Sequence, residues 1–142
     1  MIQVKAAEAW LLFKQGKTDE ALKQMYLAAD MEDKTEKHPV TPGEVVPARE
    51  LLADMLLEMN KPDEALKAYE ADLKRHRNRF NGLYGAGLAA QRSNNPEKAT
   101  LYYKQLAAVA NSADAKRPEL DAARLYLGKM EVARNKKHKI NY

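Results

Sequence analysis

The chain has 142 residues, of which 45% are apolar and 31% are charged, and it contains no cysteine. The apolar fraction is too high for a disordered chain, and the missing cysteine excludes a disulfide framework, a thiolate zinc site and a cysteine nucleophile. The formal net charge of +4 equals that of four basic residues close to the C-terminus, so the rest of the chain is neutral. These four residues are Arg134, Lys136, Lys137 and Lys139.

Neither a membrane segment nor a targeting signal is recognisable in the sequence. Its apolar runs are far shorter than the ~20 residues that cross a bilayer. The first residues lack the basic and apolar segments of a signal peptide. The compartment is therefore unknown: the cytoplasm is favoured, and the periplasm stays possible if an upstream signal is missing from this chain.

A short motif occurs three times along the chain. Residues 19–23, Asp-Glu-Ala-Leu-Lys, recur unchanged at 63–67, and a looser copy follows at 97–101. The second and third copies are 34 residues apart, whereas the first and second are 44 residues apart. The 34-residue shift also relates Pro62 to Pro96, Asn60 to Asn94, Ala65 to Ala99 and Tyr69 to Tyr103. A fixed period of this length is typical of a helical repeat array.

Each copy is predicted to form two antiparallel helices joined by a tight turn. Apolar residues ahead of each turn recur at the spacing of one helix face. Pro62 and Pro96 suit the first position of the second helix, where a missing N–H costs nothing, and Asn95 is a suitable N-cap. Small residues, Ala53 and Gly87, should let the paired helices approach closely, with the repeated tyrosines filling the gap between them.

We expect a single array over residues 1–142. Its predicted parts, in chain order, are a degenerate first repeat (1–32), a loop insertion (33–46), a second repeat (47–78), a third repeat (79–112), a capping helix (118–134) and a basic tail (135–142). The capping helix begins at Pro118 and has an apolar face and a polar outer face, as the end of an array requires. The expected fold class is all-α, a right-handed α-solenoid of antiparallel helix pairs.

This pattern resembles the tetratricopeptide repeat. The period of 34, the small-residue positions, the Pro-Asp/Glu-x-Ala segment and the tyrosines match that family over about residues 47–110. The match is weaker at the start, where Lys5 and Glu8 replace residues that are usually apolar. The segments 28–43, 47–52 and 78–86 look like the C-terminal region of a group of uncharacterised bacterial tetratricopeptide proteins. The first helix is either a degenerate first repeat or the continuation of earlier repeats. We favour the second interpretation, in which the chain is the C-terminal part of a longer protein, because Met1 enters an amphipathic pattern with no capping signal ahead of it.

The resemblance implies that the first helix of each pair lines a concave groove that holds an extended peptide or a partner helix. Residues opposite the predicted buried faces are the candidate contacts: Trp10, Glu50, Asp54, Asn81, Tyr84, Leu88 and Arg92. Amide and guanidinium groups can bind a peptide backbone or a carboxylate, and aromatic rings offer apolar area with a polar edge. The alternative is that these residues form ordinary solvated helix faces, with Trp10 buried against another part of the protein.

The inserted loop is a second candidate site. It contains His38-Pro39-Val40-Thr41-Pro42-Gly43, and a loop of this length inside a compact repeat is often functional. The candidate residues are His38, Thr41 and Arg49. The alternative is a structural loop, in which His38 and Thr41 cap helix ends and Arg49 or Glu50 fixes the segment. A metal site is disfavoured, because a single histidine without a second ligand at helical spacing is insufficient.

Catalysis and nucleic-acid binding have less support. The three histidines are widely separated and there is no Gly-rich phosphate loop, so we expect neither an enzyme nor a cofactor. A basic cluster at 74–79 could bind nucleic acid, but the neutral body of the chain disfavours this. We expect a non-catalytic module that binds a protein or peptide, with no membrane partner. The alternatives are a structural spacer and a self-associating module of a larger protein. A self-associating module would form a homo-oligomer.

Overall fold

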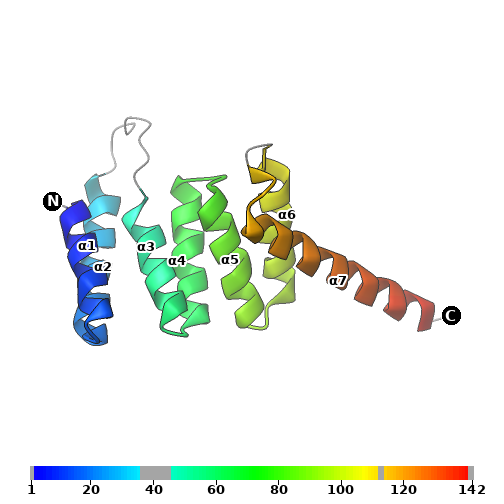
Figure 1. Ribbon diagram of the computed structural model, residues 1–142, viewed down its shortest axis with the longest axis horizontal. Coiled ribbons are helices and arrows are strands. Elements are labelled where there is room, and N and C mark those ends of the chain that lie inside the picture. Colours follow the sequence, from blue (N-terminus) through cyan, green and yellow to red (C-terminus); the bar gives the residue numbers. More distant parts are fainter. Residues whose placement is uncertain (1, 36–45, 112–113, 141–142) are drawn as a thin grey trace. The chain divides into compact units, whose positions relative to one another are not determined.

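The computed structural model describes residues 2–35, 46–111 and 114–140, and the elements in these ranges are seven α-helices (Figure 1). The all-α prediction is therefore confirmed for the described residues. The chain divides into two compact units, Met1–Arg75 (unit 1) and His76–Tyr142 (unit 2). None of the described helices is both long and apolar enough to cross a membrane.

Unit 1 consists of two helical hairpins. The first pairs α1 (Ile2–Lys14) with α2 (Thr18–Thr35), and the second pairs α3 (Ala48–Glu58) with α4 (Pro62–Arg75). Helix α2 packs on α3, and α1 also contacts α3. The first helices of the two hairpins, α1 and α3, are therefore neighbours. Fully buried alanines line the contacts within the unit together with larger side chains. The largest of these buried side chains are Met25, Leu52, Met55, Leu56 and Tyr69.

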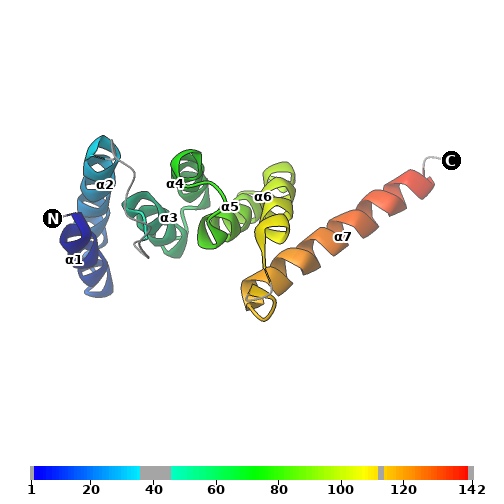
Figure 2. The same ribbon diagram turned by 90° about the horizontal axis from the view of Figure 1, so that it is seen from above.

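Unit 2 consists of one hairpin and a long final helix. Helices α5 (Phe80–Arg92) and α6 (Pro96–Val109) are antiparallel, and α7 (Pro118–Ile140) packs against α6 and also contacts α5. Helix α7 has 23 residues and α6 has 14, so α7 is longer by roughly 13 Å at about 1.5 Å per residue. Figure 2 shows its C-terminal half running beyond the end of α6.

The three hairpin turns share one backbone geometry. Each contains a residue in the left-handed region, with φ values of 84° at Gly16, 60° at Asn60 and 57° at Asn94. In each turn a backbone N–H reaches back over the left-handed residue to a carbonyl five residues earlier: Lys17 to Leu12, Lys61 to Leu56 and Asn95 to Ala90. Such bonds satisfy carbonyls that the end of a helix would otherwise leave unpaired. Asn95 also caps α6, because its side chain accepts a hydrogen bond from the backbone N–H of Lys98.

The predicted close approach of paired helices is confirmed at Gly87. A Cβ added at this position would lie 2.5 Å from ring atoms of Tyr103, closer than real Cβ contacts. Helix α6 can therefore bring the Tyr103 ring onto the backbone of α5 only because residue 87 has no side chain. Tyr103 itself is 2% exposed.

Two helices extend further than the sequence predicts. Helix α2 ends at Thr35, three residues beyond the predicted end of the first repeat, and α7 continues through the predicted basic tail to Ile140. Neither glycine nor proline lies between Gly128 and the C-terminus, so no local signal stops α7 at residue 134.

Candidate functional site

Four of the predicted contact residues lie on one face of α5. Asn81, Tyr84, Leu88 and Arg92 are spaced three, four and four residues apart, which places them on one stripe of the helix. We call this set the α5 stripe. Asn81 and Arg92 at its ends are exposed, whereas Tyr84 and Leu88 in its middle are half-buried. The stripe thus combines an apolar centre with polar groups at both ends.

The half-buried centre of the α5 stripe is supported by Tyr103 from α6. The Tyr84 and Tyr103 ring centroids are 6.3 Å apart, and Tyr126 from α7 lies edge-on to Tyr103 at 5.2 Å. The Tyr103 hydroxyl donates a hydrogen bond of 2.9 Å to Oε1 of Gln91. Because Tyr103 is fixed by this bond and by contact with Gly87, it gives Tyr84 a rigid surface to pack on.

Burial is the main influence on the pKa of Tyr103 in this aromatic cluster. It raises the pKa of Tyr103 far above the ordinary value of 10.0, and the neighbouring phenols of Tyr84 and Tyr126 raise this pKa further. The Arg92 guanidinium acts in the opposite direction, because a cation favours the phenolate. Arg92 is therefore close enough to the cluster to act on it electrostatically while its own side chain stays exposed.

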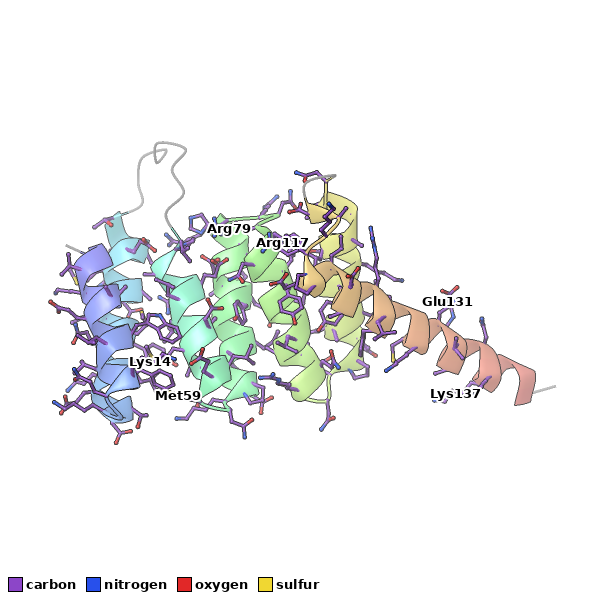
Figure 3. All side chains as sticks on the ribbon, viewed as in Figure 1. Lys14, Met59, Arg79, Arg117, Glu131 and Lys137 are labelled. Atoms are coloured by element: carbon purple, nitrogen blue, oxygen red, sulfur yellow. The ribbon has the colours of Figure 1, made fainter. Side chains whose placement is uncertain are left out.

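A second arginine of unit 2 has a structural role. The Arg117 guanidinium lies 3.6 Å from the centroid of the Phe80 ring at the start of α5. It also pairs with Asp114 at 3.6 Å and Glu119 at 3.7 Å. Figure 3 shows its position beside the first turn of α7. By contrast, Arg92 has no ion pair within the part of the chain that the structure describes, so it can bind a ligand.

In unit 1, Trp10 lies in a small aromatic and charged cluster on α1. Its ring is edge-on to Phe13 at 5.6 Å, and the Lys14 ammonium lies 5.8 Å from the Trp10 ring and 5.6 Å from the Phe13 ring. Lys14 also reaches α3, where it pairs with Glu58 at 3.6 Å. The indole Nε1 is buried without a hydrogen-bond partner. Trp10 is half-buried, so only part of its ring is open to a ligand.

The two predicted contact residues on α3 differ in their accessibility. Asp54 is half-buried, and one of its carboxylate oxygens accepts a hydrogen bond from the Tyr69 hydroxyl of α4. Glu50 is 0% exposed, so the prediction that it is an exposed contact residue is wrong. The physical reason is that the buried face of α3 is wider than one apolar stripe. It comprises Ala48, Glu50, Leu52, Ala53, Met55 and Leu56.

Arg49, the third candidate residue of the inserted loop, has a structural role, because it joins two helices. Its guanidinium donates to Asp33 Oδ2 at 2.6 Å and to Asp30 Oδ1 at 2.8 Å, which joins the start of α3 to α2. Burial acts to lower the pKa of Arg49, but the hydrogen bonds and charges of both aspartates outweigh it and raise that pKa. His38 and Thr41 lie outside the described residues.

Sequence reasoning missed the groups that hold these candidates in place. The acids of α2 that bind Arg49 are three residues apart, which is the helical spacing for two side chains on one face. That spacing was a usable signal, but it does not reveal which arginine binds there. The role of Tyr126 gave no signal, because this residue lies outside the 34-residue correspondence.

Two depressions are lined by residues other than the candidate contacts described above. One, of about 630 Å³, lies between α1 and α2 in unit 1, and its lining includes Tyr26 and Leu27. The other, of about 770 Å³, lies between α6 and α7 in unit 2, and its lining includes Leu127 and Met130. Among the described residues no group of three or more histidines and carboxylates could hold a metal ion.

No protein-family model matches the chain, and no curated protein matches it in sequence. Its fold is similar to that of a solved structure, PcrH from Pseudomonas aeruginosa, with a TM-score of 0.67. The match covers 90% of this chain and 89% of PcrH, at 14% sequence identity. The similarity at this identity concerns the fold, and it agrees with the period, the turns and the tyrosine packing described above. The chain therefore has an all-α, tetratricopeptide-like fold of sequential antiparallel helices.

Proposed function

We propose that the chain is a non-catalytic module that binds a protein or peptide through the first helices of its hairpins. The observation that carries this proposal is the α5 stripe. Tyr84 and Leu88 present apolar area on a rigid support, and Asn81 and Arg92 present donors at either end. A peptide offers both apolar side chains and backbone or carboxylate acceptors, so its chemistry matches that of the stripe.

Unit 1 supports the same proposal with a different mixture of groups. Trp10 and Phe13 offer aromatic area on α1, and the Lys14–Glu58 ion pair places charges of both signs beside it. Aromatic residues surrounded by polar groups are enriched in protein–protein interfaces. The partner's identity is not specified by these residues, and we propose only its class.

The test is capture of partner proteins by the tagged chain, followed by mass-spectrometric identification. The variant Tyr84→Ala with Arg92→Ala should lose the partners that the wild-type chain retains. A matched control, Leu101→Ala with Lys104→Ala, removes one large apolar group and one cation from exposed positions of α6 and should retain them. If both double variants capture the same proteins, the α5 stripe is not the binding surface. Arg92→Glu, which leaves the Tyr84 packing intact, covers the case in which the first variant unfolds.

Self-association is the second candidate function, and one observation favours it. Tyr26 and Leu27 beside the depression of unit 1 are 37% and 52% exposed, and Leu11 on α1 is 59% exposed. Exposed apolar groups of this size are common at contacts between protein copies. Sedimentation over a range of concentrations distinguishes the two functions, because only self-association makes the measured mass rise with concentration.

A further inference from the structure

Two buried positions of α5 recur in α7 with a shift of 37 residues. Leu83 and Leu120 are each 1% exposed, and Ala86 and Ala123 are each 0% exposed. The two helices also contact one another. Because these two pairs lie on one face of each helix, the positions opposite that face can be compared with the same shift.

The second half of the α5 stripe has similar residues on α7, whereas in the first half Asn81 corresponds to Pro118 and Tyr84 to Asp121. Leu88 of α5 corresponds to Leu125 of α7, and Arg92 corresponds to Lys129. Leu125 is 62% exposed, and Val132, seven residues and thus about two turns further on, is 55% exposed. Between them lies Gly128, where an added Cβ would meet nothing within 4 Å.

Two cations accompany this apolar row. Lys129 and Lys136 are exposed and seven residues apart, on the same side of α7 as Leu125 and Val132. Neither lysine has an ion-pair partner in the ranges that the structure describes. We call the set Leu125, Gly128, Lys129, Val132 and Lys136 the α7 outer face. It is apolar along its centre and open at Gly128. Its two lysines carry positive charge, and the exposed Asp121, one turn before Leu125, is an acid on the same side.

We infer that the α7 outer face binds an acidic amphipathic helix of a partner protein. This inference rests on the proposed function and names the chemistry of the partner. Apolar side chains seven residues apart on such a helix match the spacing of Leu125 and Val132, and its carboxylates complement Lys129 and Lys136.

The apolar content of the face favours a protein over other anionic partners. A phosphate backbone gains nothing from two exposed aliphatic side chains, so nucleic acid leaves Leu125 and Val132 unused. A membrane surface requires a continuous apolar face with large residues, and Gly128 interrupts this one. A helix can fill the open space at Gly128 with a large side chain, as the Tyr103 ring fills the space at Gly87.

The experiment uses three synthetic peptides and the full chain. The first peptide is an acidic amphipathic helix with leucines on one face and glutamates on the other, the second has lysine in place of every glutamate, and the third is a scrambled acidic sequence. Methyl NMR signals of Leu125 and Val132 report contact, and calorimetry reports affinity. We expect the first peptide to shift both methyl signals and to bind at least about tenfold more tightly than the other two, because only it supplies both complementary charge and an apolar row.

Charge reversal locates the interaction. Lys129→Glu with Lys136→Glu should weaken binding of the first peptide by about tenfold or more and should reduce its salt dependence. Lys61→Glu with Lys67→Glu makes the same charge change at exposed positions of unit 1 and should leave the affinity within about twofold, because only screened long-range effects remain.

Several results overturn the inference. Equal binding of the lysine peptide, or binding that leaves the Leu125 and Val132 signals unmoved, contradicts it. So does a single-stranded RNA or an anionic vesicle that shifts these signals more strongly than the peptide. If the Leu125 and Val132 signals shift when the chain alone is concentrated, the face binds a second copy of the chain instead, and the inference is wrong. If Lys129→Glu with Lys136→Glu keeps the captured proteins that Tyr84→Ala with Arg92→Ala loses, the inference fails while the proposed function stands.

Discussion

The hairpin α3–α4 of unit 1 and the hairpin α5–α6 of unit 2 place a tyrosine at the same position and surround it differently. The Tyr69 hydroxyl donates to the carboxylate of Asp54, and the Tyr103 hydroxyl donates to the amide oxygen of Gln91. The Tyr103 ring also lies against Gly87, whereas the equivalent of Gly87 in unit 1 is Ala53. The repeat therefore fixes where the ring lies, and the neighbouring residues determine how close the helices come and which group satisfies the hydroxyl.

The largest expected effect comes from adding a methyl group where α5 and α6 are closest. Gly87→Ala should lower the free energy of unfolding by about 2–3 kcal/mol, because the new Cβ would overlap a Tyr103 ring that other contacts hold in place. Gly128→Ala is the matched control, since nothing lies within 4 Å of its added Cβ. It should raise stability by about 0.5–1 kcal/mol through better helix propensity. Equal effects of the two changes in urea unfolding would contradict the close approach at Gly87.

The two tyrosine hydroxyls should differ when each is removed. Tyr69→Phe should cost about 1.5 kcal/mol, because the hydrogen bond goes to a carboxylate, and Tyr103→Phe should cost less, about 1 kcal/mol, because its acceptor is neutral. Both variants keep the ring and thus the packing. Chemical unfolding of each variant measures the difference, and a larger loss for Tyr103→Phe would reverse the assignment.

Two arginines that join helices of different segments, Arg49 and Arg117, should show smaller effects on stability. Arg49→Ala in unit 1 should cost about 1 kcal/mol, because two aspartates of α2 lose a partner whose side chain is only 16% exposed. Arg117→Ala in unit 2 should cost less, since that side chain is 41% exposed and its carboxylate contacts are longer than 3.5 Å. Thermal unfolding at low and high salt measures both, and a larger loss for Arg117→Ala would contradict this ranking.

The smallest expected effect is on the dependence of stability on alkaline pH. Burial raises the pKa of Tyr103 in the folded chain, so above pH 10 the unfolded chain loses this proton while the folded chain keeps it. Stability should therefore be unaffected by Tyr103 below pH 10 and should decrease as pH rises further. Burial and then Glu64 also raise the pKa of Tyr26, so Tyr103→Phe should reduce the slope without abolishing it. An unchanged slope would show that Tyr103 titrates normally.

The features that the sequence predicted are those with local causes. The tight turns followed from the repeat, in which Asn60 corresponds to Asn94, and Asn95 was predicted as the N-cap that the structure shows. The Gly87 and Tyr103 pair was predictable because the 34-residue period places both in a hairpin of known pattern. These signals were enough for the all-α fold and for the order of the helices.

The features that the sequence did not predict depend on contacts between distant residues. Glu50 occupies a position that one helix alone would expose, and its burial results from the surrounding structure. Arg49 binds acids that precede it by 16 and 19 residues across the inserted loop. Helix α7 continues to Ile140 through a segment that is rich in cations and poor in apolar residues, so hydrophobic periodicity did not indicate its end.

Trp10 gives unit 1 an optical signal of its own. It is the only tryptophan of the chain and lies in unit 1, edge-on to Phe13 and near Lys14, which pairs with Glu58 of α3. Emission excited in the indole alone therefore follows the melting of unit 1, whereas the far-ultraviolet circular dichroism of the helices follows both units. Recording both during one denaturant titration would show whether the units unfold in one cooperative step or in succession, with no label attached.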